Sequence, residues 1–112
     1  MIVLGHRIAK RIDIFEFRKM LENYRRENVI CADHTFFRLS EKQREIFTCE
    51  KIKEYLFDSE PFMVGVQNNG CHAVFYKYEK QRFLRIILDI RAHNISVVTF
   101  YVIEKNQLPV IK

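Results

Sequence analysis

The spacing of apolar and polar positions divides the chain into a helical first half and a strand-rich second half. From 13 to 28, apolar residues recur at intervals of three and four, the spacing of one helix face. Asp13 is a suitable N-cap for this helix, and Asn28 is a suitable C-cap. After Asp58 the apolar positions alternate with polar ones or form short runs. We therefore expect strands from that point onward.

Two further helices and four strands complete the predicted elements. Residues 29–32 form a short extended segment, Asp33 can cap a helix through about Arg44, and Thr48 can cap another over 49–57. The predicted strands cover 62–67, 71–78, 83–92 and 95–104. Turn-forming residues at 68–70, 79–82 and 93–94 separate these strands. Because the connections are short, we predict an α+β fold with N-terminal helices packed on one face of a four-stranded antiparallel meander sheet.

Length and composition indicate one folded domain with a basic surface. The 112 residues are 48% hydrophobic and carry a net charge of +5 with a pI near 9.2, so we expect a single domain over 1–112. The positive charge favours an acidic partner such as RNA, DNA or an acidic protein. No apolar run is long enough to span a membrane, and the first residues lack the pattern of a secretory signal. We expect a cytoplasmic protein.

The cysteines and histidines do not indicate a metal or a disulfide framework. Cys31, Cys49 and Cys71 are odd in number, widely spaced and without a CxxC pair, so we expect reduced thiols. The histidines are scattered, with His72 expected on an exposed strand edge and His93 in a turn. No metal site or cofactor is predicted. The sequence contains none of the motifs that mark P-loop nucleotide hydrolases, dinucleotide-binding domains, zinc proteases or serine hydrolases.

A row of charged residues on the predicted sheet is the first candidate site. In the third strand one face is uniformly apolar, whereas Arg85, Asp89 and Arg91 share the other face with two apolar residues. Lys77 and Arg82 come from the neighbouring strand and turn. We expect these cations to lie on an accessible face that can hold a phosphate backbone. The alternative is an ordinary solvated face on which Asp89 pairs with an arginine.

His34 and Arg38 form the second candidate site. They lie four residues apart in a predicted helix and therefore share a face. An imidazole beside a guanidinium can bind phosphate and move a proton near neutral pH. The alternative is that neighbouring phenylalanines pack into the core and these two residues line a solvated helix edge.

The order of these features resembles a family of small uncharacterised domains related to the BrnT toxins. The resemblance covers about 34–103 and includes HTFFR, the short helix CEKIKEYL and the final strands LRIILDIRAHNISVVTFYV. Within it the most specific matches are His34, Arg38, Asp89, Thr99 and Tyr101. The first 31 residues have no counterpart, so we describe 1–31 as an N-terminal helical extension and 32–104 as a toxin-like core.

The resemblance implies a RelE/ParE-like fold and a metal-independent endoribonuclease of a toxin–antitoxin pair. In such an enzyme Arg38, Arg85 and Arg91 would bind phosphate, His34 would be the acid/base, and Tyr101 a second proton-transfer candidate. RNA would be the substrate and an antitoxin protein the partner, and a homo-oligomer is compatible with the extra helix. The competing hypothesis is a non-catalytic basic binding module for a protein or nucleic-acid partner.

Overall fold

The computed structural model describes residues 7–31 and 46–109 and contains a single mixed sheet. Its strands are β1 (Ile8–Ile12), β2 (Val29–Cys31), β3 (Met63–Gln67), β4 (His72–Lys77), β5 (Arg82–Ile90) and β6 (Ile95–Glu104). The helices within the described ranges are α1 (Ile14–Leu21) and α3 (Cys49–Asp58), with short 3₁₀ turns at Arg26–Asn28 and Lys105–Gln107. The predicted helix over 33–44 falls outside these ranges.

The strand order shows that the predicted four-stranded antiparallel meander is wrong. The sheet has six strands in the order β1-β3-β4-β5-β6-β2. β1 adds antiparallel to β3 at one edge, whereas β2 adds parallel to β6 at the other edge. Both added strands come from the segment that was expected to be a helical extension, so the RelE/ParE-like description does not fit.

Local sequence explains the two helices and their limits. The Asp13 side chain accepts a hydrogen bond from the Glu16 amide at 3.1 Å, and Thr48 caps α3 by accepting from the Lys51 amide at 3.2 Å. These are two of the three predicted N-caps, and the third, Asp33, lies outside the described residues. α1 is shorter than expected because it ends at Leu21 and the chain then turns through a 3₁₀ segment into β2.

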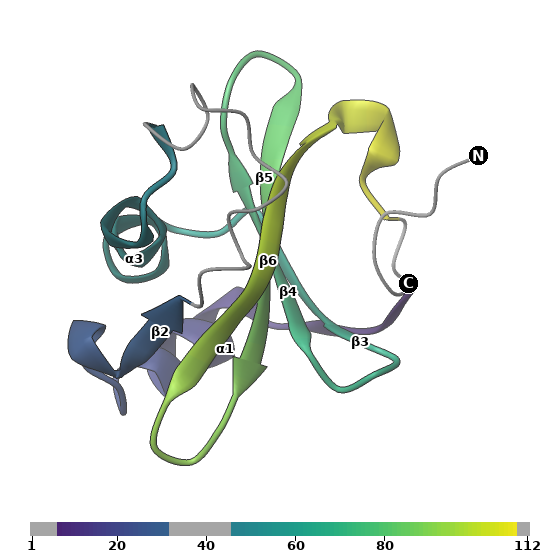
Figure 1. The fold of residues 1–112 in the computed structure, drawn as a ribbon. Coiled ribbons are helices and arrows are strands. Elements are labelled where there is room, and N and C mark those ends of the chain that lie inside the picture. The colour runs from purple at the N-terminus through teal and green to yellow at the C-terminus, as the bar shows by residue number, and fades with distance from the viewer. Residues whose placement is uncertain (1–6, 32–45, 110–112) are drawn as a thin grey trace.

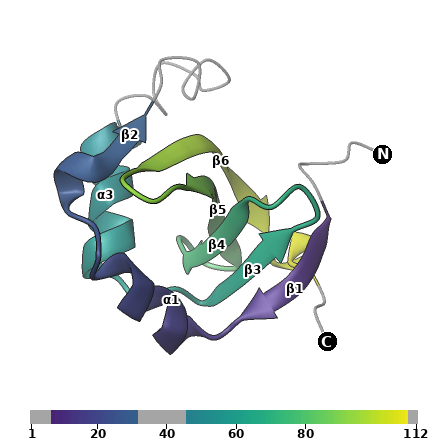
Figure 2. The ribbon, with the colours of Figure 1, turned by 90° about the horizontal axis from the view of Figure 1, so that it is seen from below.

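Both helices lie on the same face of the sheet, as Figures 1 and 2 show. The principal core forms between them and that face. α1 contributes Phe17 and Leu21, α3 contributes Ile52 and Leu56, and the sheet contributes alternate residues of its central strands, all of them buried. Burying this apolar surface is the main term that stabilises the fold.

The opposite face of the sheet is also buried, which corrects the prediction of an open, charged face. A second apolar cluster there contains Met63, Phe75, Phe83, Ile87 and Ile103, among others. The 3₁₀ turn after β6 lies on this side of the sheet, away from the helices (Figure 2), and Leu108 just beyond it packs on the cluster. The apolar residues that alternate with the charges of β5 were the sequence signal for this second core.

A disulfide joins Cys31 at the end of β2 to Cys49, the first residue of α3. Their Cα atoms are 5.9 Å apart, within the normal range for a disulfide. The prediction of three reduced thiols is therefore wrong for this pair, whereas Cys71 is a free, half-buried thiol. The pairing depends on β2 taking the edge position beside β6, which brings it against α3, and the sequence did not indicate that position.

Candidate functional site

The residues at the centre of the catalytic hypothesis, His34 and Arg38, lie outside the described residues. They belong to the segment between Cys31 and Cys49, whose two ends are joined by the disulfide. Their roles as acid/base and phosphate ligand stay predictions.

The four predicted RNA-binding cations do not come together into one site. Arg82 begins β5 and Arg91 follows its end, so they are separated by about 30 Å of extended chain. Arg82 pairs with Glu79 at 3.4 Å and with Glu104 at 3.2 Å, while Arg91 pairs with Asp89 at 3.0 Å. The pair between Arg91 and Asp89 is the alternative that the sequence left open for this face. Lys77 places its ammonium 5.6 Å from the centre of the Phe62 ring.

Arg85 is buried, contrary to the prediction that it lies on an accessible surface. Only 6% of the residue is exposed, and burial lowers the pKa of its guanidinium. Its guanidinium carbon lies 5.2 Å from the centre of the Phe75 ring and 5.7 Å from that of Tyr101. The structure thus brings together two predicted site residues, Arg85 and Tyr101, but as part of the second core.

His72 is also more buried than predicted. β4 lies between β3 and β5, so this histidine is on an inner strand and not on an exposed edge. Its ring lies 6.4 Å from that of Phe17, and its Nδ1 is buried without a hydrogen-bond partner in the described part of the protein. Burial lowers the pKa of the imidazole and so favours its neutral form.

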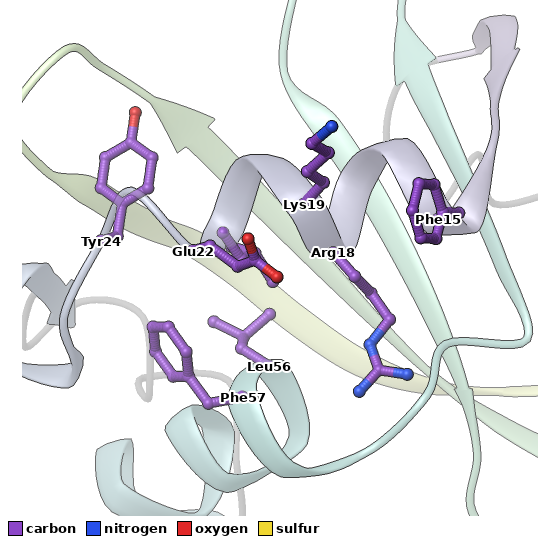
Figure 3. Close-up of a pocket in the computed structure, with 8 residues that line it drawn as sticks. Phe15, Arg18, Lys19, Glu22, Tyr24, Leu56 and Phe57 are labelled. Atoms are coloured by element: carbon purple, nitrogen blue, oxygen red, sulfur yellow. The ribbon is translucent and has the colours of Figure 1, made fainter.

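A groove lies between α1 and α3 (Figure 3). It has a volume of about 470 Å³. Leu21, Leu56 and Phe57 give it apolar walls, and Figure 3 shows Arg18 pointing from α1 toward the side of α3, whereas Lys19 points away from it. The full lining is Phe15, Arg18, Lys19, Leu21, Glu22, Tyr24, Leu56 and Phe57.

Arg18 and Lys19, the two cations that line this groove, take part in none of the ion pairs found among the described residues, whereas Arg82 and Arg91 of the predicted strip are paired with carboxylates. Of the basic residues that the structure describes, those in β1 and α1 take part in none of the ion pairs. They are Lys10, Arg11, Arg18 and Lys19, and Arg7 just before β1 is likewise in none of these pairs. Phe15 lies among them in the sequence and is 73% exposed. An exposed aromatic ring beside unpaired cations can stack on a base while the cations bind phosphate.

Sequence reasoning did not identify this groove, although one signal for it was present. Phe15 falls outside the spacing of Ile14, Phe17 and Leu21 that marked the buried face of the helix. A large aromatic residue off that face, with cations on both sides in the sequence, indicates an exposed contact residue. The walls from α3 could not be inferred, because they depend on how the two helices pack side by side.

Neither a membrane span nor a metal cluster is found within residues 7–31 and 46–109. Neither helix there has the length and apolar character needed to cross a bilayer. In the same ranges no three His, Cys, Asp or Glu side chains are grouped so that they could hold a metal ion.

Comparison with known proteins leaves the family assignment open. The chain matches no protein-family model, no curated protein and no solved structure. The resemblance to the BrnT-related domains therefore stays a prediction.

Proposed function

We propose that this protein is an RNA-binding module that holds single-stranded RNA on the surface of α1 and in the groove between α1 and α3. The observation that carries the proposal is that Arg18 and Lys19, which take part in no ion pair among the described residues, line a groove together with the exposed ring of Phe15. The basic net charge of the whole chain, +5, is consistent with a polyanionic partner.

Each part of the groove has a distinct role in this proposal. Arg18 and Lys19 bind phosphate oxygens, because within the described part of the chain neither is in an ion pair that RNA would have to displace. Phe15 offers a ring face for an unpaired base. Glu22, the C-cap of α1, also lines the groove and repels phosphate, so the backbone of the RNA lies on the side of Arg18 and Lys19.

The proposal is tested by the salt dependence of RNA binding. Fluorescence anisotropy of a labelled oligouridine is measured in EDTA at several salt concentrations, with Arg18→Ala/Lys19→Ala beside the wild type. Losing two phosphate contacts lowers the slope of log K against log salt by about 1.4 and weakens binding roughly 20-fold at about 0.1 M salt. Phe15→Ala weakens binding by a similar factor at all salt concentrations, because stacking contributes about 1–3 kcal/mol per base.

A control with the same loss of charge separates a local site from general attraction. Arg82→Ala/Arg91→Ala also removes two positive charges, but each of these arginines is already paired with carboxylates. We expect this control to change the affinity less than about threefold, since screened charges away from the contact contribute little. Equal losses in the two double variants would contradict binding through α1.

Metal-independent cleavage of RNA is a separate hypothesis that rests on His34 and Arg38. One observation favours binding without cleavage. Arg85 lies between two aromatic rings and only 6% of it is exposed, so a substrate phosphate would have to displace part of the second core to reach it. The test is incubation of labelled RNA in EDTA. Cleavage by the wild type that is lost in His34→Ala/Arg38→Ala would establish ribonuclease activity. RNA that stays intact would contradict cleavage and support binding alone.

An acidic antitoxin-type protein is the competing partner for the same cations. It would occupy β1 and α1 and displace RNA from them. Competition between the labelled RNA and a co-purified acidic protein, measured by anisotropy, tests this hypothesis. A homo-oligomer is tested by the mass of the protein in solution with and without RNA.

A further inference from the structure

We propose that a second cavity, next to the RNA-binding groove, receives one unpaired nucleobase and prefers guanine. This inference rests on the proposed RNA binding and names the base that the same surface selects. The cavity is formed by the start of α1, the end of α3, the connection to β3 and the end of β4. It has a volume of about 470 Å³ and is lined by Ile14, Tyr55, Ser59, Glu60, Pro61, Phe62, Tyr76 and Lys77. Small-ligand pockets have volumes in this range.

Tyr76 provides a buried polar group that lacks a partner. The residue is 1% exposed, and its hydroxyl makes no hydrogen bond to the part of the chain that the structure describes. Leaving such a group unsatisfied costs about 1–3 kcal/mol, and because Tyr76 lines the cavity, a ligand oxygen or nitrogen that reaches the hydroxyl would remove this cost. Burial raises the pKa of this phenol and keeps it protonated, so it can donate a hydrogen bond.

Aromatic side chains make up much of the remaining wall. The rings of Tyr55 and Tyr76 lie 5.3 Å apart at a tilt of 49°. Phe62 is among the exposed large apolar residues, and the Lys77 ammonium lies 5.6 Å from the centre of its ring. Planar rings beside a cation suit a flat, conjugated ligand that is attached to a phosphate.

Glu60 determines which flat ligand fits. Its side chain is exposed and takes part in none of the ion pairs found among the described residues. A free carboxylate repels phosphate and accepts hydrogen bonds from N–H groups. Guanine is the RNA base that presents two adjacent N–H donors, on N1 and N2, to one carboxylate. We therefore assign the base to Glu60 and its phosphate to Lys77.

The cavity and the groove are close enough for one RNA strand to use both. Adjacent residues of α1, Ile14 and Phe15, line the cavity and the groove respectively. The same is true of Tyr55 and Leu56 on α3. Arg18 of the groove is near enough to Tyr76 to oppose the rise in its pKa. A strand held by α1 can thus turn one base into the cavity.

The test compares a labelled oligouridine with the same oligomer carrying one central guanosine. We expect the guanosine to tighten binding to the wild type about tenfold, as two charge-assisted hydrogen bonds allow. Glu60→Gln should remove this gain, whereas the control Glu27→Gln, which removes an exposed carboxylate on the 3₁₀ turn before β2, should keep it. Tyr76→Phe should reduce the gain about threefold without lowering the melting temperature, because it removes a hydroxyl that has no partner.

The possible results separate the base pocket from the RNA-binding proposal. Equal binding of both oligomers, with the salt dependence intact, would contradict the base pocket but remain consistent with the proposed RNA binding. If neither oligomer binds, the proposed RNA binding is contradicted. A titration with 5′-GMP then tests whether the cavity binds guanine on its own. Binding of 5′-GMP that is lost in Glu60→Gln would support a mononucleotide site, whereas no binding would overturn it. A full guanosine gain in Tyr76→Phe would overturn the role of the buried hydroxyl.

Discussion

Removing the disulfide between Cys31 and Cys49 should lower the stability of the whole domain. The bond ties the sheet-edge strand β2 to the first residue of α3, across a sequence separation of 18 residues. In the double variant Cys31→Ala/Cys49→Ala, the native contacts around both positions largely remain. The main effect is that the unfolded chain gains the freedom that the cross-link had removed.

The loop length determines the size of this effect. For a closed loop of 18 residues, the chain-entropy relation gives about 3 kcal/mol at 25 °C. A domain of 112 residues loses roughly 4 °C of melting temperature per kcal/mol, so the midpoint should fall by about 12 °C.

Thermal unfolding followed by far-UV circular dichroism measures this difference. The wild type is compared with the double variant, each with and without a strong thiol reductant. We expect the reductant to lower the midpoint of the wild type to that of the variant and to leave the variant unchanged. Cys71→Ala is the matched control, because that thiol is free, and it should keep the response to reductant. A wild-type midpoint that does not respond to reductant would refute the cross-link as a stabilising element.

Three further predictions follow from burial and backbone conformation. Burial lowers the folded-state pKa of His72 below that of the unfolded chain, so its contribution to stability is complete above about pH 6.5 and is lost as the pH falls through the folded-state pKa. His72→Gln should therefore reduce the loss of melting temperature between pH 7 and pH 5, and an unchanged loss would contradict this contribution. Gly70 has φ +90° with open space around it, so Gly70→Ala should cost about 1 kcal/mol in urea unfolding through backbone strain alone; no change would show that the turn relaxes. Phe17→Ala, at a core position 1% exposed, should cost about 4 kcal/mol, and Phe15→Ala should stay within about 0.5 kcal/mol of the wild type; equal losses would contradict the assigned helix face.

Sequence patterns located most of the elements because local signals define them. The caps Asp13 and Thr48 fix where α1 and α3 begin, and the turn at Gly70 separates β3 from β4. β1 was missed because IAKRI has no alternation of apolar and polar residues. β2 was read as extended, but its pairing with β6 depends on residues far away in the chain, and no local pattern indicates such a partner.

The candidate site was harder to predict than the fold elements. The charged residues of β5 suggested an open face, whereas Phe83 and Ile87 on that same face belong to a second core that closes over Arg85. The groove beside Arg18 depends on the packing of two helices whose separate sequences show only their own buried faces. Helix packing and ion pairing decide which cations stay available, and neither can be read from a periodic pattern.

The strand order has a consequence for how the domain folds. β3, β4, β5 and β6 follow one another in the chain and in the sheet, whereas β1 and β2 pair at the two edges with partners distant in sequence. Closing a long loop costs conformational entropy before stabilising contacts form. We therefore expect the central hairpins to form first and the edge strands to dock afterwards. Native-state hydrogen exchange should then show amides of β1 and β2 opening at lower free energy than those of β4 and β5, and uniform protection would contradict this order. In kinetic terms, the sheet assembles from its middle outward, and the strand that carries Lys10 and Arg11 is among the last to be fixed.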